Sequence, residues 1–152
     1  MTPDFQLLNI TRKNFLHAIS SLSIEQLNTI PAGFNNNIIW NFGHVIVTQQ
    51  LLCYQMAGLE LKVEPELTAK YRKGTKPEGF ISGEELQKLK DMAFPLLEEL
   101  EQDYRNNEFT AYKPYETSYG AELKSIEDAV EFVTVHEALH YGYVMALKRA
   151  VK

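Results

Sequence analysis

Four long stretches of this 152-residue chain repeat apolar residues every three or four positions, the period of an α-helix with one buried face. They span residues 3–22, 37–56 and 82–105, and from 125 almost to the C-terminus. Helices of this kind bury their apolar faces against one another. The sequence therefore predicts an all-α fold, a four-helix bundle with long connections, in a single domain covering residues 1–152.

Helix-capping residues predict where these helices begin. The expected N-terminal signals are Thr2 with Pro3, Ser23, the Asn35–Asn37 cluster, Ser82 and Ser125. Ser23 opens a short additional helix that ends at Ile30. Pro95 lies inside the third long stretch and is expected to kink or split it, because proline lacks the N–H group that a helix interior needs.

Two connections are long. Residues 61–81 are rich in proline, glycine and lysine and are expected to form an ordered loop, whereas the aromatic segment 109–120 is expected to be extended. Their length leaves open which helices are neighbours. The basic residues of the first connection, Lys70 to Lys76, are interpreted as a solvated loop and not as a nucleic-acid or lipid patch.

Charge and composition exclude several classes of protein. The chain has 20 acidic and 15 basic residues, a net charge of −5, which argues against a nucleic-acid partner. No apolar run reaches the ~18 residues of a membrane span. The first residues show no export signal, and the lone Cys53 allows no intrachain disulfide. These features predict a cytoplasmic location.

The last long helix contains the pattern H-E-x-x-H at residues 136–140. Residues four apart lie about 40° apart on one helix face, so His136 and His140 can bind the same metal ion. The alternative interpretation is a pair of polar side chains on a helix flank. Zinc proteases with this motif take a third ligand further along the chain. Residues 141–152 offer no His, Asp, Glu or Cys, so a third ligand must come from upstream.

Two upstream histidines are available. His17 lies away from the apolar stripe of its helix and is expected at the surface. His44 lies in the most apolar helix, where an imidazole must be hydrogen-bonded or coordinated, because an unsatisfied buried polar group costs ~1–3 kcal/mol. Alone it would be interpreted as a satisfied core histidine, but the pair at 136 and 140 favours coordination. Three imidazoles with an open position are typical of a catalytic metal site.

The segment Trp40-Asn41-Phe42-Gly43-His44 and, about 90 residues later, His136 to Gly142 resemble the DinB-like superfamily of DinB/YfiT-type metalloproteins. The resemblance rests on W-x-x-x-H on the second helix and H-x-x-x-H-x-G on the last, and it spans essentially the whole chain. It implies a four-helix bundle, a metal ion held by His44, His136 and His140, and frequently a homodimer. Tyr143 departs from the pattern, since many members carry glutamine there.

Members with known activity are thiol-dependent transferases and an isomerase, so the resemblance implies a small-molecule substrate and a low-molecular-weight thiol. The hypothesis is that the metal activates a bound thiol or water. A metal-dependent hydrolase and a non-catalytic metal-binding or ligand-sensing bundle are the alternatives. Zn²⁺ or Ni²⁺ is the expected metal, and Fe²⁺ and Mn²⁺ stay open because nitrogen ligands select weakly.

Four further residues have expected roles. Glu137 is interpreted either as a general base or as a structural residue on the helix flank. Helical offsets bring Asn41, Gln50 and Tyr143 within reach of the metal and make them candidates for the pocket wall. Cys53 lies about half a turn round the helix from His44 and is expected to be buried and inert.

Overall fold

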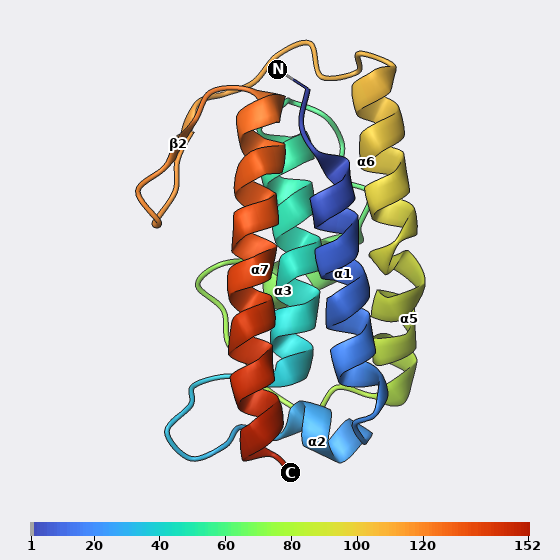
Figure 1. The fold of residues 1–152 in the computed structure, drawn as a ribbon, viewed down its shortest axis with the longest axis vertical. Helices are drawn as coiled ribbons and strands as arrows, with labels where there is room; N and C mark the ends of the chain where they lie inside the picture. Colours follow the sequence, from blue (N-terminus) through green and yellow to red (C-terminus); the bar gives the residue numbers. More distant parts are fainter. Residues whose placement is uncertain (1) are drawn as a thin grey trace.

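Four helical columns lie side by side in the computed structural model, which describes residues 2–152 (Figure 1). Three columns are formed by α1, α3 and α7, and the fourth by α5 followed by α6. The elements in chain order are α1 (Phe5–Ser20), α2 (Ile24–Asn28), α3 (Ile38–Gln50), the π-helical turn η1 (Leu51–Gln55), α4 (Pro65–Tyr71), α5 (Gly83–Ala93), α6 (Pro95–Arg105), β1 (Tyr115–Glu116), β2 (Glu122–Leu123) and α7 (Ile126–Ala150). The predicted all-α bundle is confirmed.

Most helices start where the capping residues predict. The side chains of Ser23, Asn37, Ser82 and Ser125 each accept a hydrogen bond from the backbone N–H three positions on. The first helix differs, because the Asp4 carboxylate accepts the N–H of Gln6 and begins the helix there. The prediction of Thr2 as the cap is therefore wrong.

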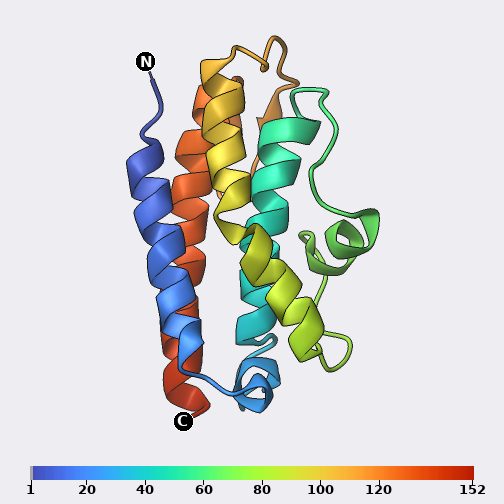
Figure 2. The same ribbon diagram turned by 90° about the vertical axis from the view of Figure 1, so that its right-hand side faces the viewer.

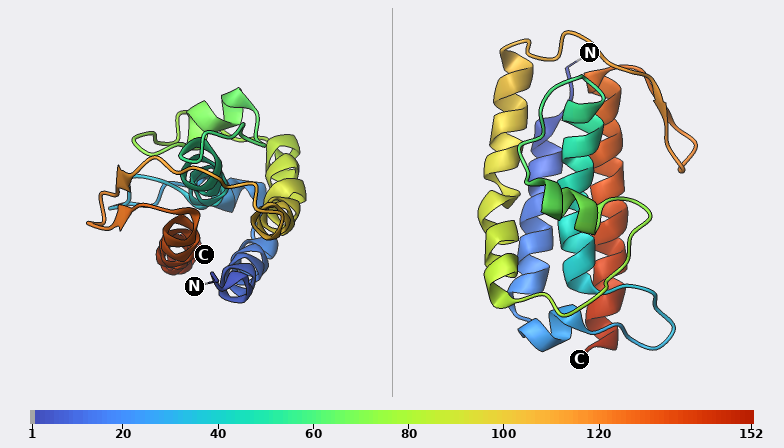
Figure 3. Two further views of the ribbon diagram at one scale, coloured as in Figure 1. Left: turned by 90° about the horizontal axis from the view of Figure 1, so that it is seen from above. Right: turned by 180° about the vertical axis from the view of Figure 1, so that it is seen from behind.

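The helix α3 forms the centre of the molecule. It contacts α2, α4, α5 and α7, and the view from above shows α3 between α7 and α4 (Figure 3). Nearly every residue from Ile38 to Gln50 is buried, as expected for a helix that is apolar over most of its circumference. The π-helical turn η1 continues it to Gln55, close to the predicted end.

Pro95 splits the fourth column, as predicted, and Figure 2 shows the bend between α5 and α6. The N–H groups of Leu97 and Glu98 both bond to the Phe94 carbonyl, at 2.9 and 3.0 Å. The Ala93 carbonyl is thereby released from helix bonding, and it accepts a hydrogen bond of 2.5 Å from Nη1 of Arg12.

The connection from 61 to 81 is not a loop throughout, because it contains the short helix α4 with Pro65 at its first turn. Leu67 and Tyr71 are buried against α3. Gly43 permits this close approach: a Cβ atom there would lie 2.5 Å from a ring carbon of Tyr71. The other connection pairs β1 with β2 in an antiparallel hairpin, Tyr115 opposite Leu123, beside α7 (Figure 1).

Candidate metal centre

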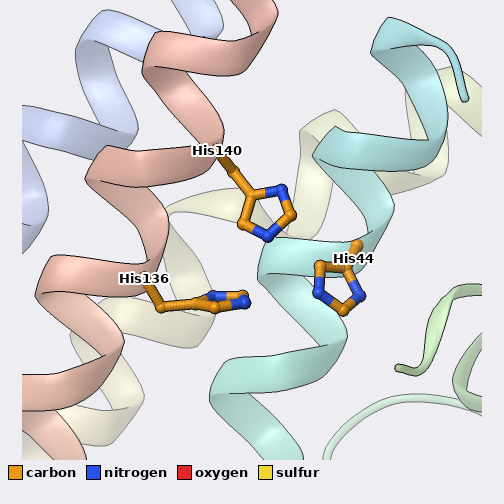
Figure 4. Close-up of side chains that lie close together, drawn as sticks. All are labelled: His44, His136 and His140. Carbon is orange, nitrogen blue, oxygen red and sulfur yellow. The ribbon is translucent and has the colours of Figure 1, made fainter. Parts of the chain in front are cut away.

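The structure brings together the three histidines that the sequence singled out. His44 comes from α3, and His136 and His140 come from successive turns of α7 (Figure 4). One ring nitrogen from each lies within 4.8 Å of the others, and the ring centroids are 4.5–5.1 Å apart. His17 is exposed on α1 and takes no part in the cluster.

His44 is held in one tautomer. Its Nδ1 lies 2.7 Å from the Tyr71 carbonyl oxygen, which can only accept, so Nδ1 carries the proton and Nε2 keeps its lone pair. The indole of Trp40 stacks on the imidazole with centroids 4.6 Å apart and planes 12° from parallel. The ring is therefore oriented by two elements, since Tyr71 ends α4 and Trp40 belongs to α3.

His140 is oriented in the same way by Asn41, whose Oδ1 lies 2.7 Å from its Nδ1. The Asn41 amide nitrogen donates to Oδ1 of Asn36 at 3.0 Å and to the Asn37 carbonyl at 2.7 Å, which turns Oδ1 toward the imidazole. The Nδ1 of His140 must then donate, leaving Nε2 free. Metal-binding histidines commonly donate their other N–H to such an oxygen.

Burial keeps the three imidazoles neutral. Desolvation, and then repulsion from the neighbouring histidines, lowers the pKa of His136 to about 3. The same causes lower the pKa of His140 to about 4, with His44 as the neighbour. The pKa of His44 also lies below its usual value because of burial. Neutral imidazole is the form that coordinates a metal, so the cluster fits a divalent cation at pH 7.

A cavity of about 490 Å³ adjoins the cluster, within the range of small-molecule sites. All three histidines line it, together with Thr48 and Met56 at the end of the α3 column. Aromatic and apolar side chains make up much of the remaining wall, among them Leu51, Leu52, Tyr115, Tyr119, Phe132 and Leu139. A three-histidine site keeps a coordination position for water or substrate, and here that position would have a cavity beside it.

Glu137 lies elsewhere. Its carboxylate forms a buried ion pair with Nε of Arg12 on α1, and it does not line the cavity. Arg12 also donates to Oε1 of Gln49 on α3 at 3.2 Å and to the released Ala93 carbonyl. This arrangement fits the structural interpretation of Glu137 and gives no support to the general-base interpretation.

The three pocket candidates have different surroundings. None of the three lines the cavity, but Asn41 contacts the ligand candidate His140. Gln50 is buried and its Oε1 accepts the backbone N–H of Lys62 at 2.8 Å. Tyr143 packs edge-on against Phe34, with ring centroids 5.6 Å apart. Gln50 is six residues after His44 and so is turned about 240° from it, which explains why it faces elsewhere.

Several residues at the site have no signal in the sequence. The Tyr71 carbonyl reaches His44 from 27 positions away, and the cavity wall includes Arg72, Lys73 and the hairpin residues Tyr115 and Tyr119. Only the tertiary fold brings these segments to the histidines. Cys53, in contrast, is fully buried away from the cavity, and burial raises the pKa of its thiol to about 12.

Comparison with known proteins identifies the family of the chain. The sequence profile of the DinB superfamily matches residues 7–144, a range that includes all three histidines. A comparison with curated proteins gave no match. Across residues 2–152, none of the helices has both the length and the apolarity that a membrane crossing requires. Because the profile covers most of the sequence, the chain belongs to the DinB superfamily.

Proposed function

We propose that the chain holds a divalent metal ion through His44, His136 and His140, and that it catalyses the transfer of a low-molecular-weight thiol to small electrophiles. One observation carries the proposal: Nδ1 of His44 and Nδ1 of His140 are both engaged by oxygen acceptors, so both rings keep an Nε2 lone pair for a common ligand beside the cavity. The Nε2 of His44 has one long contact of 3.4 Å with Oγ1 of Thr48, which a metal ion would replace. Zn²⁺ or Ni²⁺ is the expected ion, with Fe²⁺ and Mn²⁺ as alternatives.

A bound cation would supply one kind of chemistry, a lowered pKa for a thiol or water that reaches it. The residues of the chain would supply the rest. Tyr71 and Asn41 fix the orientation of two imidazoles, and the apolar wall around Leu51, Leu52 and Phe132 limits the access of water.

The surroundings of Glu137 favour a thiol over water as the nucleophile. Hydrolases with the H-E-x-x-H motif use the glutamate as a general base. Here that carboxylate is paired with Arg12, and among the described residues that line the cavity none is acidic. A thiol has a pKa of about 8.5 against about 15.7 for water, so it needs much less help to lose its proton. The hydrolase and the non-catalytic metal-binding bundle remain the alternatives.

Metal analysis tests whether the three histidines bind a metal ion, which the transferase and both alternatives require. Purified protein is loaded with Zn²⁺, Ni²⁺, Mn²⁺ and Co²⁺ in parallel, desalted and analysed for metal content. We expect about one ion per chain in wild type and in the control His17→Ala, and a loss of retained metal in His44→Ala. Wild type that retains none of these ions would refute the proposal.

An activity panel then separates the alternatives. Metal-loaded protein is incubated with several low-molecular-weight thiols and a set of electrophiles, and adducts are measured by mass spectrometry; ester and amide hydrolysis is measured in parallel. Metal-dependent adduct formation supports the transferase. Hydrolysis without adduct formation supports the hydrolase, and metal retention with neither activity supports a binding role.

A homodimer is the second part of the proposal, and the exposed face of α7 supports it. Val135 and Leu139 lie one turn apart on this face and are 41% and 51% exposed, and adjoining exposed apolar side chains are common at interfaces. We expect sedimentation velocity to show a dimer for wild type and a monomer for Val135→Glu. Gln87→Glu on α5 adds the same charge and should stay dimeric. A monomeric wild type would contradict this part of the proposal.

We also propose a cytoplasmic location, to be tested by cell fractionation.

A further inference from the structure

We infer that the cavity beside the three histidines selects small organic molecules with an anionic group, which is bound by Arg72 and Lys73. The inference rests on the proposed function, because it specifies the substrate class of that cavity. It starts from the basic residues between Lys70 and Lys76, which the sequence pattern alone indicates to be a solvated loop.

The segment that orients His44 also carries the two cationic residues, which are exposed at the cavity wall. The carbonyl of Tyr71 contacts Nδ1 of His44, and Arg72 and Lys73 follow directly and line the cavity. The backbone of Arg72 is held at both ends: its N–H bonds to the Thr68 carbonyl at 3.1 Å, and its carbonyl accepts from Oγ1 of Thr75 at 2.7 Å. The side chain of Arg72 can therefore change without loss of these contacts.

The charges around these residues point to an anionic ligand. In the described part of the chain, two lysines near this segment have carboxylate partners, Lys70 with Glu85 at 2.7 Å and Lys88 with Glu64 at 3.1 Å, whereas Lys76 outside the cavity wall has none. Arg72 and Lys73 form no ion pair with any described carboxylate. The chain carries 20 acidic residues, yet none of them is among the described residues of the cavity wall. Positive charge on the cavity wall of an otherwise acidic protein favours the binding of an anionic ligand there.

The aromatic residues of the cavity wall indicate an apolar body for the ligand. Tyr119 of the hairpin packs near Phe132 of α7, with ring centroids 6.1 Å apart, and Tyr115 also lines the cavity. The loop after α4 and the hairpin lie on the same side of α7 in two views (Figures 1 and 3). A ligand of matching chemistry has an apolar or aromatic body and one anionic end, as in an aryl-alkyl carboxylate.

A matched pair of probes tests the inference. Binding of 4-phenylbutyrate and of 4-phenylbutanol, which differ in the anionic group, is measured by ligand-observed NMR titration on metal-free and on Co²⁺-loaded protein. We expect wild type to bind the acid about three- to tenfold more tightly, the range for one or two partly exposed ion pairs. The preference should fall as salt is added.

Two double variants that lose the same charge test whether the preference for the acid comes from Arg72 and Lys73. Arg72→Gln/Lys73→Gln should bind both probes alike, whereas Lys13→Gln/Lys76→Gln, altered outside the cavity wall, should keep the wild-type preference. Equal binding of the two probes by wild type, no binding of either, or a preference that survives Arg72→Gln/Lys73→Gln would overturn the inference. A preference for the acid in protein that retains no Co²⁺ would support the anion site and refute the metal-dependent function, so the two failures are distinguishable.

Discussion

Arg12 and Glu137 form an ion pair in the interior of the bundle although 125 positions separate them in the sequence. Both side chains are essentially inaccessible to solvent, at 0% and 1% exposure. Glu137 is the second residue of the H-E-x-x-H pattern, so the histidines on either side of it face the cavity while the carboxylate faces α1. One short stretch of α7 thus provides both the candidate ligands and a contact that holds two columns together.

Removing the carboxylate should cost stability and leave the metal centre in place. We expect Glu137→Ala to lower the free energy of unfolding by about 3–5 kcal/mol, because Arg12 would keep a buried charge without a partner. Urea denaturation measures the loss, and retained metal is measured on the folded fraction. A general base would behave differently: Glu137→Gln would abolish activity without a matching loss of stability.

Asn41 should contribute to metal affinity through His140. We expect Asn41→Ala to weaken metal binding about 10–100-fold, because the Nδ1 of His140 loses the acceptor that fixes its tautomer. Competition with a chelator of known affinity gives the dissociation constant of the metal for each variant. Asn14→Ala, an exposed change on α1, is the control and should match wild type. Equal affinity in both variants would mean that Asn41 does not orient the ligand.

Gly43 should be intolerant of any side chain. Gly43→Ala places a Cβ atom 2.5–2.7 Å from three ring carbons of Tyr71, so the ring must shift, and we expect it to disturb the Tyr71 carbonyl that contacts His44. We expect a loss of about 1–3 kcal/mol, the usual cost of overpacking, together with weaker metal binding. Gly83→Ala in the first turn of α5 is the control, since a Cβ there meets nothing within 4 Å. Alanine has the higher helix propensity, by up to about 1 kcal/mol, so this control should be neutral or stabilising.

The metal-free protein should lose stability in mild acid. The unfolded chain takes up protons on its histidines near pH 6.5, whereas in the folded protein the pKa is about 3 for His136 and about 4 for His140. Between those values the unfolded state binds more protons, so the free energy of unfolding falls as the pH is lowered. The expected slope is on the order of 1 kcal/mol per pH unit for each histidine.

Urea midpoints at pH 7, 6 and 5 in the presence of chelator measure this effect. The double variant His136→Gln/His140→Gln should show a shallower dependence on pH, because two of the depressed imidazoles are gone. Identical slopes for wild type and this variant would count against the burial of neutral histidines as the cause.

The sequence predicted those parts of the fold that depend on local pattern. The period of apolar residues gave the long helices, and Pro95 marked the break in the fourth column. The helix α4 escaped prediction because seven residues show no clear period and Pro and Gly surround them. His44 was singled out by chemistry, since an imidazole in an apolar helix requires a partner.

The rest of the site depends on which helices are neighbours. Helical offsets give the direction of a side chain about its own axis, and they do not say what it meets there. Gln50 and Tyr143 therefore meet Lys62 and Phe34 and not the cavity. The contact of the Tyr71 carbonyl with His44 could not be predicted from the sequence, because every residue carries a backbone carbonyl group.

The Ala93 carbonyl, which the break at Pro95 releases from helix bonding, helps to align the helical columns along the bundle axis. Through it, the single guanidinium of Arg12 touches every other column: α5 at Ala93, α3 at Gln49 and α7 at Glu137. A slide of α1 by one helical turn, about 5.4 Å, would break all these bonds and leave the charge in an apolar interior. Apolar faces tolerate such slippage far better than a charged group with fixed partners does. Arg12 therefore sets the axial register of the columns, and with it the height at which His44 on α3 meets the two histidines of α7.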